Sequence, residues 1–255
     1  MKKFVIPALL LTLLSGCGTP PGGGSQAPVQ NNSRATSSAK VHTELAGMYY
    51  ERSQLGIALG EIAAALQADR NYAPAYNVRG LIHMALREDK EAEEDFKQSL
   101  QLEKGDSDAH NNYGWFLCQR DRAKESIPHF MAALKNPLYT TPERAYLNAG
   151  VCSQKAGQLK DAEEFLQRAL LVQPGNPQAL LALAELGFAN GDYLAAKKYF
   201  ATYVERSEEL TAGQLWLAVR IERKLGDRNA AASYAVQLRK RYPEARETQL
   251  MMQGE

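Results

Sequence analysis

The sequence of 255 residues predicts an all-α fold, a right-handed α-solenoid of about six stacked helical hairpins. Two observations carry this prediction: small residues recur with a period close to 34 residues, and large apolar residues follow them at a constant offset. No segment alternates apolar and polar residues in the way that predicts a β-strand. One hairpin cannot bury its apolar face alone, so hairpins of this kind stack on their neighbours.

The period is visible when one position of each repeat is aligned. That position holds Ala46, Gly80, Gly114, Gly150, Ala184 and Val219, at spacings of 34, 34, 36, 34 and 35 residues. Twelve residues further on stand Ala58, Ala92, Ser126, Ala162, Ala196 and Ala231, and four beyond those Ile62, Phe96, Phe130, Leu166, Phe200 and Ala235. A small residue on each helix permits close approach, and a large apolar residue one turn away fills the space beside it.

The register defines the elements in order. The six repeats are residues 39–72, 73–106, 107–140, 143–176, 177–210 and 212–245, of which the first is the weakest match, as expected of a terminal repeat. Two extra residues fall around Thr140–Pro142, and Pro128 inside a second helix predicts a kink. The tail, residues 246–255, is expected either to form a short capping helix or to fray. A 34-residue period with this pattern resembles the tetratricopeptide repeat.

The N-terminus has the pattern of a lipoprotein signal peptide. Two lysines precede an apolar run over residues 4–14, which is too short to span a bilayer but has the length of a secretory core. Leu14-Ser15-Gly16-Cys17 resembles a bacterial lipobox, whose cysteine thiol accepts a diacylglycerol. We therefore expect a signal peptide over residues 1–16 and lipidation of Cys17. A plain signal peptide with a chance cysteine, or a short buried helix, is the alternative.

Residues 17–38 are expected to be a lipidated flexible tether, because they are rich in Pro, Gly, Ser, Asn and Gln and have little apolar surface to bury. The residue after Cys17 is Gly18 and not aspartate. By resemblance to enterobacterial lipoproteins, this chain lacks the signal that retains a lipoprotein in the inner membrane. The expected location is the outer membrane, with the folded part on the periplasmic side.

Charge and composition argue against nucleic acid and against catalysis. The chain has 30 Lys and Arg against 29 Asp and Glu, and loss of Lys2 and Lys3 would leave 28 against 29, so no basic field is available for a phosphate backbone. The four histidines are His42, His83, His110 and His129, and no two have a metal-ligand spacing. No glycine-rich phosphate loop precedes a helix pattern. We expect no enzymatic activity, no cofactor, no metal and no small-molecule substrate.

Cys118 and Cys152 lie on the predicted first helices of adjacent repeats, at similar heights. First helices of neighbouring repeats run side by side in a tetratricopeptide stack, and the periplasm is oxidising. The hypothesis is a disulfide between the two, and the alternative is two separately buried thiols.

The resemblance to tetratricopeptide repeats also implies a binding groove, since positions 5, 9, 12 and 13 of each first helix point into the concave face of such proteins. The corresponding residues here are Tyr50, Asn77, Leu81, Met84, Asn111, Trp115, Gln119, Leu147, Val151, Gln154, Leu181 and Phe188. Large apolar groups with amides among them suit an extended or helical peptide. The alternative is that Trp115 and Leu81 are partly buried between helices. Thr43 and Gly47 stand where chaperone-tail receptors require Lys and Asn, which disfavours that class.

Three segments resemble a particular family. They are HNNYGWFLCQ (residues 110–119), NPLYTTPERAYLNAGVC (136–152) and LGDRNAAASYAVQLRKRYPEA (225–245), and they resemble the type IV pilus biogenesis and stability lipoproteins of the PilW/PilF family. The resemblance implies a non-enzymatic outer-membrane lipoprotein that binds a protein partner, the pilus secretin or another pilus component. It would promote secretin localisation and assembly, or stabilise pili. The alternatives are a general periplasmic adaptor that tethers a protease or peptidoglycan synthase, and an enzyme with a distributed site.

Overall fold

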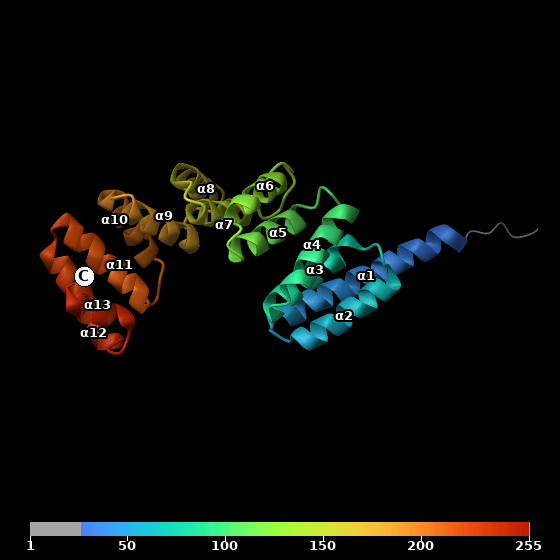
Figure 1. Cartoon of the computed structure of the whole chain (residues 1–255), viewed down its shortest axis with the longest axis horizontal. Coiled ribbons are helices and arrows are strands. Elements are labelled where there is room, and N and C mark those ends of the chain that lie inside the picture. Colours follow the sequence, from blue (N-terminus) through green and yellow to red (C-terminus); the bar gives the residue numbers. More distant parts are fainter. Residues whose placement is uncertain (1–26, 255) are drawn as a thin grey trace, which may run out of the picture.

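A computed structural model describes residues 27–254, and within them the chain forms thirteen helices and no strand (Figure 1). The helices are α1 (Ala27–Glu51), α2 (Leu55–Ala68), α3 (Ala73–Leu86), α4 (Asp89–Leu102), α5 (Ser107–Gln119), α6 (Ala123–Ala133), α7 (Pro142–Lys155), α8 (Leu159–Val172), α9 (Pro177–Ala189), α10 (Tyr193–Val204), α11 (Ala212–Leu225), α12 (Arg228–Arg241) and α13 (Arg246–Gln253). The first twelve pair into six hairpins that stack in chain order, and α13 packs against α11 and α12. The prediction of an all-α solenoid is confirmed.

The first helices begin where the repeat register begins. Helices α3, α5, α9 and α11 start at Ala73, Ser107, Pro177 and Ala212, and α7 starts at Pro142. Pro128 lies inside α6, which continues to Ala133. The tail forms the helix α13, so of the two alternatives for this segment the structure has the capping helix.

The largest difference from the sequence analysis is the start of α1. Residues 27–38 are helical and not part of a flexible tether as expected. No glycine or proline occurs from Val29 to Ala46, and Pro28 lies in the first turn, where proline is tolerated. The Thr36 hydroxyl donates to Asp69 Oδ2 at 2.9 Å, which ties this extension to the end of α2. The signal peptide expected over residues 1–16 and Cys17 lie outside the described residues.

The second, third and fourth hairpins close by bringing a glycine backbone of the first helix against a large side chain of the second. A methyl group built on Gly80 would lie 2.9 Å from the ring of Phe96, and one built on Gly114 would lie 2.8 Å from the ring of Phe130. Both rings are fully buried. Only glycine permits this approach without displacing the ring, which is the physical reason for the small and large positions of the repeat.

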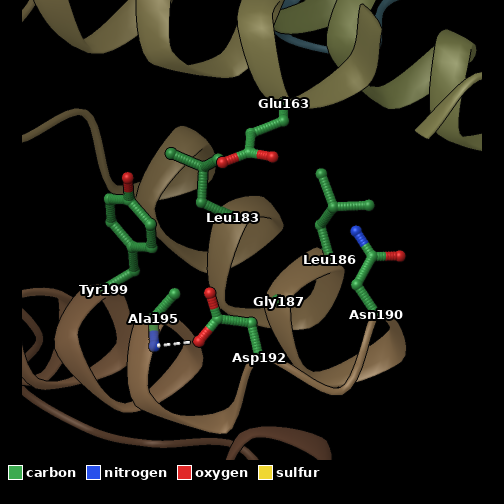
Figure 2. A pocket seen from close by; sticks show the side chains of 8 residues that line it. All are labelled: Glu163, Leu183, Leu186, Gly187, Asn190, Asp192, Ala195 and Tyr199. Carbon is green, nitrogen blue, oxygen red and sulfur yellow. Dashed lines mark hydrogen bonds between the residues drawn. The ribbon is translucent and has the colours of Figure 1, made fainter. Parts of the chain in front are cut away.

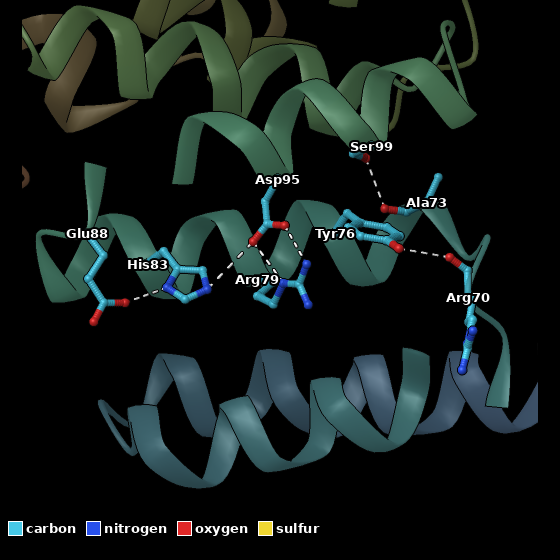
Figure 3. Close-up of polar contacts among 8 residues, drawn as sticks. All are labelled: Arg70, Ala73, Tyr76, Arg79, His83, Glu88, Asp95 and Ser99. Carbon is cyan, nitrogen blue, oxygen red and sulfur yellow. Dashed lines mark hydrogen bonds and ion pairs between the residues drawn. The ribbon is translucent and has the colours of Figure 1, made fainter. Parts of the chain in front are cut away.

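Polar contacts between α3 and α4 support the same packing (Figure 3). The Arg79 guanidinium donates to both oxygens of the buried Asp95 carboxylate, at 2.9 and 2.7 Å. The hydrogen bond and charge of Asp95 raise the pKa of Arg79, so the guanidinium stays protonated. At the other end of the hairpin the Ser99 hydroxyl donates to the Ala73 carbonyl at 2.9 Å.

Cys118 on α5 and Cys152 on α7 form a disulfide, with Cα atoms 5.8 Å apart. Both residues are fully buried, and Phe130 and the half-buried Trp115 pack around them. The bond joins the first helices of the third and fourth repeats.

None of the thirteen helices described combines the length and the apolar character needed to cross a bilayer.

The glycine contact predicts opposite effects of one substitution at two sites. Gly114→Leu should lower the free energy of unfolding by about 1–3 kcal/mol, because the new side chain must displace Phe130. Gly60→Leu, at an exposed helical glycine with open space around it, should raise it by about 0.5–1 kcal/mol through helix propensity. Urea unfolding of both variants measures this, and equal effects at the two sites would contradict the packing argument.

The disulfide predicts that replacing both Cys118 and Cys152 by alanine lowers the free energy of unfolding by about 3–4 kcal/mol, the chain-entropy effect of a loop of this length. Wild-type protein should lose the same amount in reductant, whereas the double variant should be insensitive to it. Mass spectrometry after alkylation of the unreduced, denatured chain provides the control, since labelling of two thiols would rule the bond out.

Candidate functional site

Two open depressions overlap along the first helices. One has a volume of about 1220 Å³ and the other about 950 Å³, and both are lined by Tyr50, Leu81, Asn112 and Arg144. Their walls come from α1, α3, α5 and α7, and the second reaches the start of α9 at Gln178. We call this surface the first-helix groove.

The structure brings half of the twelve predicted groove residues to these depressions. Those lining them are Tyr50, Asn77, Leu81, Asn111, Trp115 and Leu147. Those that do not are Met84, Gln119, Val151 and Gln154, which lie on α3, α5 and α7, and Leu181 and Phe188, which lie on α9.

The apolar members are half-buried and not fully exposed side chains. Leu81 and Met84 pack on the cluster around Phe96, and Trp115 packs on the cluster around the disulfide. Adjacent first helices lie close enough for these side chains to insert between them, so part of each belongs to the core. Trp115 and Leu81 are therefore partly buried between helices, which is the alternative given in the sequence analysis.

Asparagine side chains form a ladder along the floor of the groove. Asn112 Nδ2 donates to Asn77 Oδ1 at 3.1 Å, and Asn148 Nδ2 donates to Asn111 Oδ1 at 3.0 Å. These bonds connect α3, α5 and α7. Asn77 and Asn111 are buried, whereas Asn112 and Asn148 are half-buried. Each amide has two donor hydrogens and two acceptor lone pairs, more than the ladder uses, so Asn112 and Asn148 can also bond a peptide backbone.

Two members of this asparagine ladder were missed by the sequence analysis. Asn112 and Asn148 both occupy position 6 of their repeats, next to the positions used to choose candidates. The occurrence of asparagine at the same position of two adjacent repeats was the signal in the sequence that could have identified them.

Acidic groups surround the end of the groove nearest α3. The acidic residues lining the larger depression are Glu51, Glu103, Asp106 and Asp108, against one cation, Arg144. Asp106 caps α5, where its Oδ1 accepts from the backbone N–H groups of Asp108 and Ala109. Burial raises the pKa of the Asp106 carboxyl, and these hydrogen bonds oppose that effect.

Two histidines without a metal-ligand spacing in sequence meet in the structure. His110 on α5 and His129 on α6 have their Nδ1 atoms 3.1 Å apart. Burial lowers the pKa of His129 to about 4, and the neighbouring His110 adds to this effect. No group of three or more His, Cys, Asp or Glu side chains able to hold a metal occurs within residues 27–254, so the pair is a packing contact.

A small pocket of about 280 Å³ lies between α8, α9 and α10 (Figure 2). Asp192, one of its polar lining residues, caps α10 by accepting from the Ala195 N–H at 2.9 Å. Gly187 forms part of the wall where α9 approaches α10 closely. Its polar lining residues are Glu163, Asn190, Asp192 and Tyr199.

Comparison with known proteins defines the class first. Models of the tetratricopeptide repeat match residues 73–106 and 153–218, and the helical hairpins described above have that repeat's length and packing. The chain is a tetratricopeptide-repeat protein.

Its relatives define the family. A crystal structure described as PilW, a widely conserved type IV pilus biogenesis factor, is 37% identical, with a TM-score of 0.79 over 84% of this chain and 98% of the other. A solved structure of Pseudomonas aeruginosa pilF is 25% identical, with a TM-score of 0.79 over 88% of this chain and 99% of the other. The type IV pilus assembly protein PilF of Pseudomonas aeruginosa is 27% identical over 94% of each chain. This chain belongs to the type IV pilus biogenesis family of PilW and PilF.

Proposed function

We propose that this chain is a non-enzymatic scaffold of type IV pilus biogenesis whose first-helix groove binds an extended segment of the pilus secretin. The observation that carries the proposal is the asparagine ladder, which crosses three first helices at the floor of an open depression. Backbone-like amides in a row favour a partner that offers its own backbone, as an extended polypeptide does.

The dimensions of the groove are consistent with such a segment. Four first helices at the usual interaxial distance of about 9 Å span about 27 Å. An extended chain advances about 3.3 Å per residue, so this span accommodates about eight residues. The half-buried Leu81, Trp115 and Leu147 would contact alternate side chains of the segment, and the ladder would contact its backbone.

The proposed anchor is lipid on Cys17, in the outer membrane and on its periplasmic face. Anchoring there would raise the local concentration of the groove near the secretin without adding any contact. Holding one protein beside another in this way needs no catalysis.

A variant in the groove tests the proposal. Asn148→Arg should break the ladder and place a long side chain in the depression, which reduces surface pili and secretin multimers several-fold. Gln101→Arg on α4, an exposed glutamine that does not line the groove, is the matched control and should leave both unchanged. Thermal melting of both purified variants separates lost binding from lost folding. Normal piliation in a folded Asn148→Arg variant would contradict the role of the groove.

Deletion of the whole gene and a Cys17→Ala variant test the remaining parts. Deletion should remove pili and secretin multimers while cell-wall growth stays normal, and Cys17→Ala should remove the protein from the outer-membrane fraction. Unchanged piliation with altered wall turnover would favour a general envelope adaptor instead. Normal fractionation of Cys17→Ala would rule out the lipid anchor.

A further inference from the structure

Arg220 on α11 lies between two aromatic rings from neighbouring first helices. Its Cζ atom is 4.7 Å from the ring centroid of Phe188 on α9 and 5.6 Å from that of Trp216. Both distances are within the range of a cation–π contact. The rings therefore hold the guanidinium group in a fixed place.

Arg220 differs from the other half-buried arginines of the described chain. These others are Arg79, Arg120 and Arg122, and each forms an ion pair with a carboxylate, that of Asp95, Asp89 and Glu93 respectively. No described carboxylate lies within 4.0 Å of the Arg220 guanidinium, and its Nε atom is buried without a hydrogen-bond partner. A partly desolvated cation of this kind would gain free energy from a carboxylate supplied by another molecule.

The nearest acidic group by repeat register does not supply that carboxylate. Glu185 on α9 occupies position 9 of its repeat, as Arg220 does in the next, yet the two form no ion pair. Burial lowers the pKa of Arg220, and the charge of Glu185 only partly opposes this effect. The guanidinium remains protonated and available.

The site lies on the same face of the first helices, beyond the groove, and carries the opposite charge. Trp216, Arg220 and Lys224 occupy positions 5, 9 and 13 of the sixth repeat, the positions that define the groove in the other repeats. Residues four apart on a helix share a face, so the two cations lie in line. Lys224 Nζ lies 6.0 Å from the ring centroid of Tyr193. The face formed by the first helices is thus acidic near α3 and cationic at α11.

We propose that Arg220, held between Phe188 and Trp216, is a binding site for an acidic side chain of the partner segment, with Lys224 beside it for a second one. This inference rests on the proposed function and adds the chemistry and direction of the partner. The segment is an acidic peptide whose carboxylates lie on α11 and whose other residues run along the first helices in the direction of the acidic depression near α3.

Calorimetric titration of the full chain in detergent with synthetic peptides tests the proposal. The probe is an eight-residue peptide of alternating leucine and glutamate, acetylated and amidated at its ends, and its counterpart has glutamine for glutamate. The wild-type chain should bind the glutamate peptide about tenfold more tightly, as charge-assisted hydrogen bonds predict. Equal affinities, or binding of neither peptide, would overturn the proposal.

Variants assign the preference to the site. Arg220→Met keeps the aliphatic stem between the rings and should abolish the tenfold preference, whereas Arg239→Met, at an exposed arginine on α12, should preserve it. If Arg220→Met fails to fold, Lys224→Met serves as the second variant, because Lys224 is exposed, and should reduce the preference about threefold. An unchanged preference in either folded variant would overturn the assignment.

A third probe separates the two sources of a carboxylate. The glutamine peptide with a free C-terminus should bind no better than its amidated form, and Arg220-dependent binding of the free form alone would assign the site to a chain terminus and overturn the proposal.

The two proposals can fail separately. Loss of pili in Asn148→Arg without any glutamate preference would contradict only this inference. Arg220-dependent binding with intact pili after gene deletion would contradict only the proposed function.

Discussion

The close approach of the two helices within each hairpin is the constraint on which the rest of the structure depends. Gly80 against Phe96 and Gly114 against Phe130 show its form: a bare backbone on the first helix receives an aromatic ring from the second. Because the second helices are held on one side in this way, the first helices line the other side in chain order. The groove exists because of that separation, and its floor consists of whatever side chains the first helices direct away from the contact.

Those side chains differ along the groove in a consistent way. Neutral amides link adjacent helices at Asn112 and Asn148, acidic groups surround the end near α3, and the cations Arg220 and Lys224 lie beyond the groove on α11. Neutral amides suit recognition of a peptide backbone, which does not depend on the partner's sequence. Charged groups of opposite sign at some distance from each other favour one partner and one orientation of it. Membership of the pilus biogenesis family and this distribution of groups both favour recognition of a polypeptide.

The fold was predictable from the sequence because the glycine and phenylalanine positions repeat with the period of the structure itself. The extent of α1 was not, because residues 33–38 are exposed apart from the half-buried Ala35, so the helix there depends on local propensity and on Thr36. The groove was predictable in part. Tyr50 and Trp115, chosen by register, line the depressions, but whether a side chain is covered by its neighbours depends on helix spacing. The lack of an ion-pair partner for Arg220 depends on which side chains surround it in the folded structure. The spacing of residues in the sequence does not predict those neighbours.

The disulfide has a mechanical consequence. A solenoid is a chain of interfaces in series, so tension applied to its ends passes through every interface in turn. The covalent bridge between α5 and α7 prevents the third and fourth repeats from separating, whereas the boundaries on either side are held by non-covalent packing alone. Under load, therefore, the molecule should yield at one of those outer boundaries, and the central pair of repeats should be the last part of the stack to come apart.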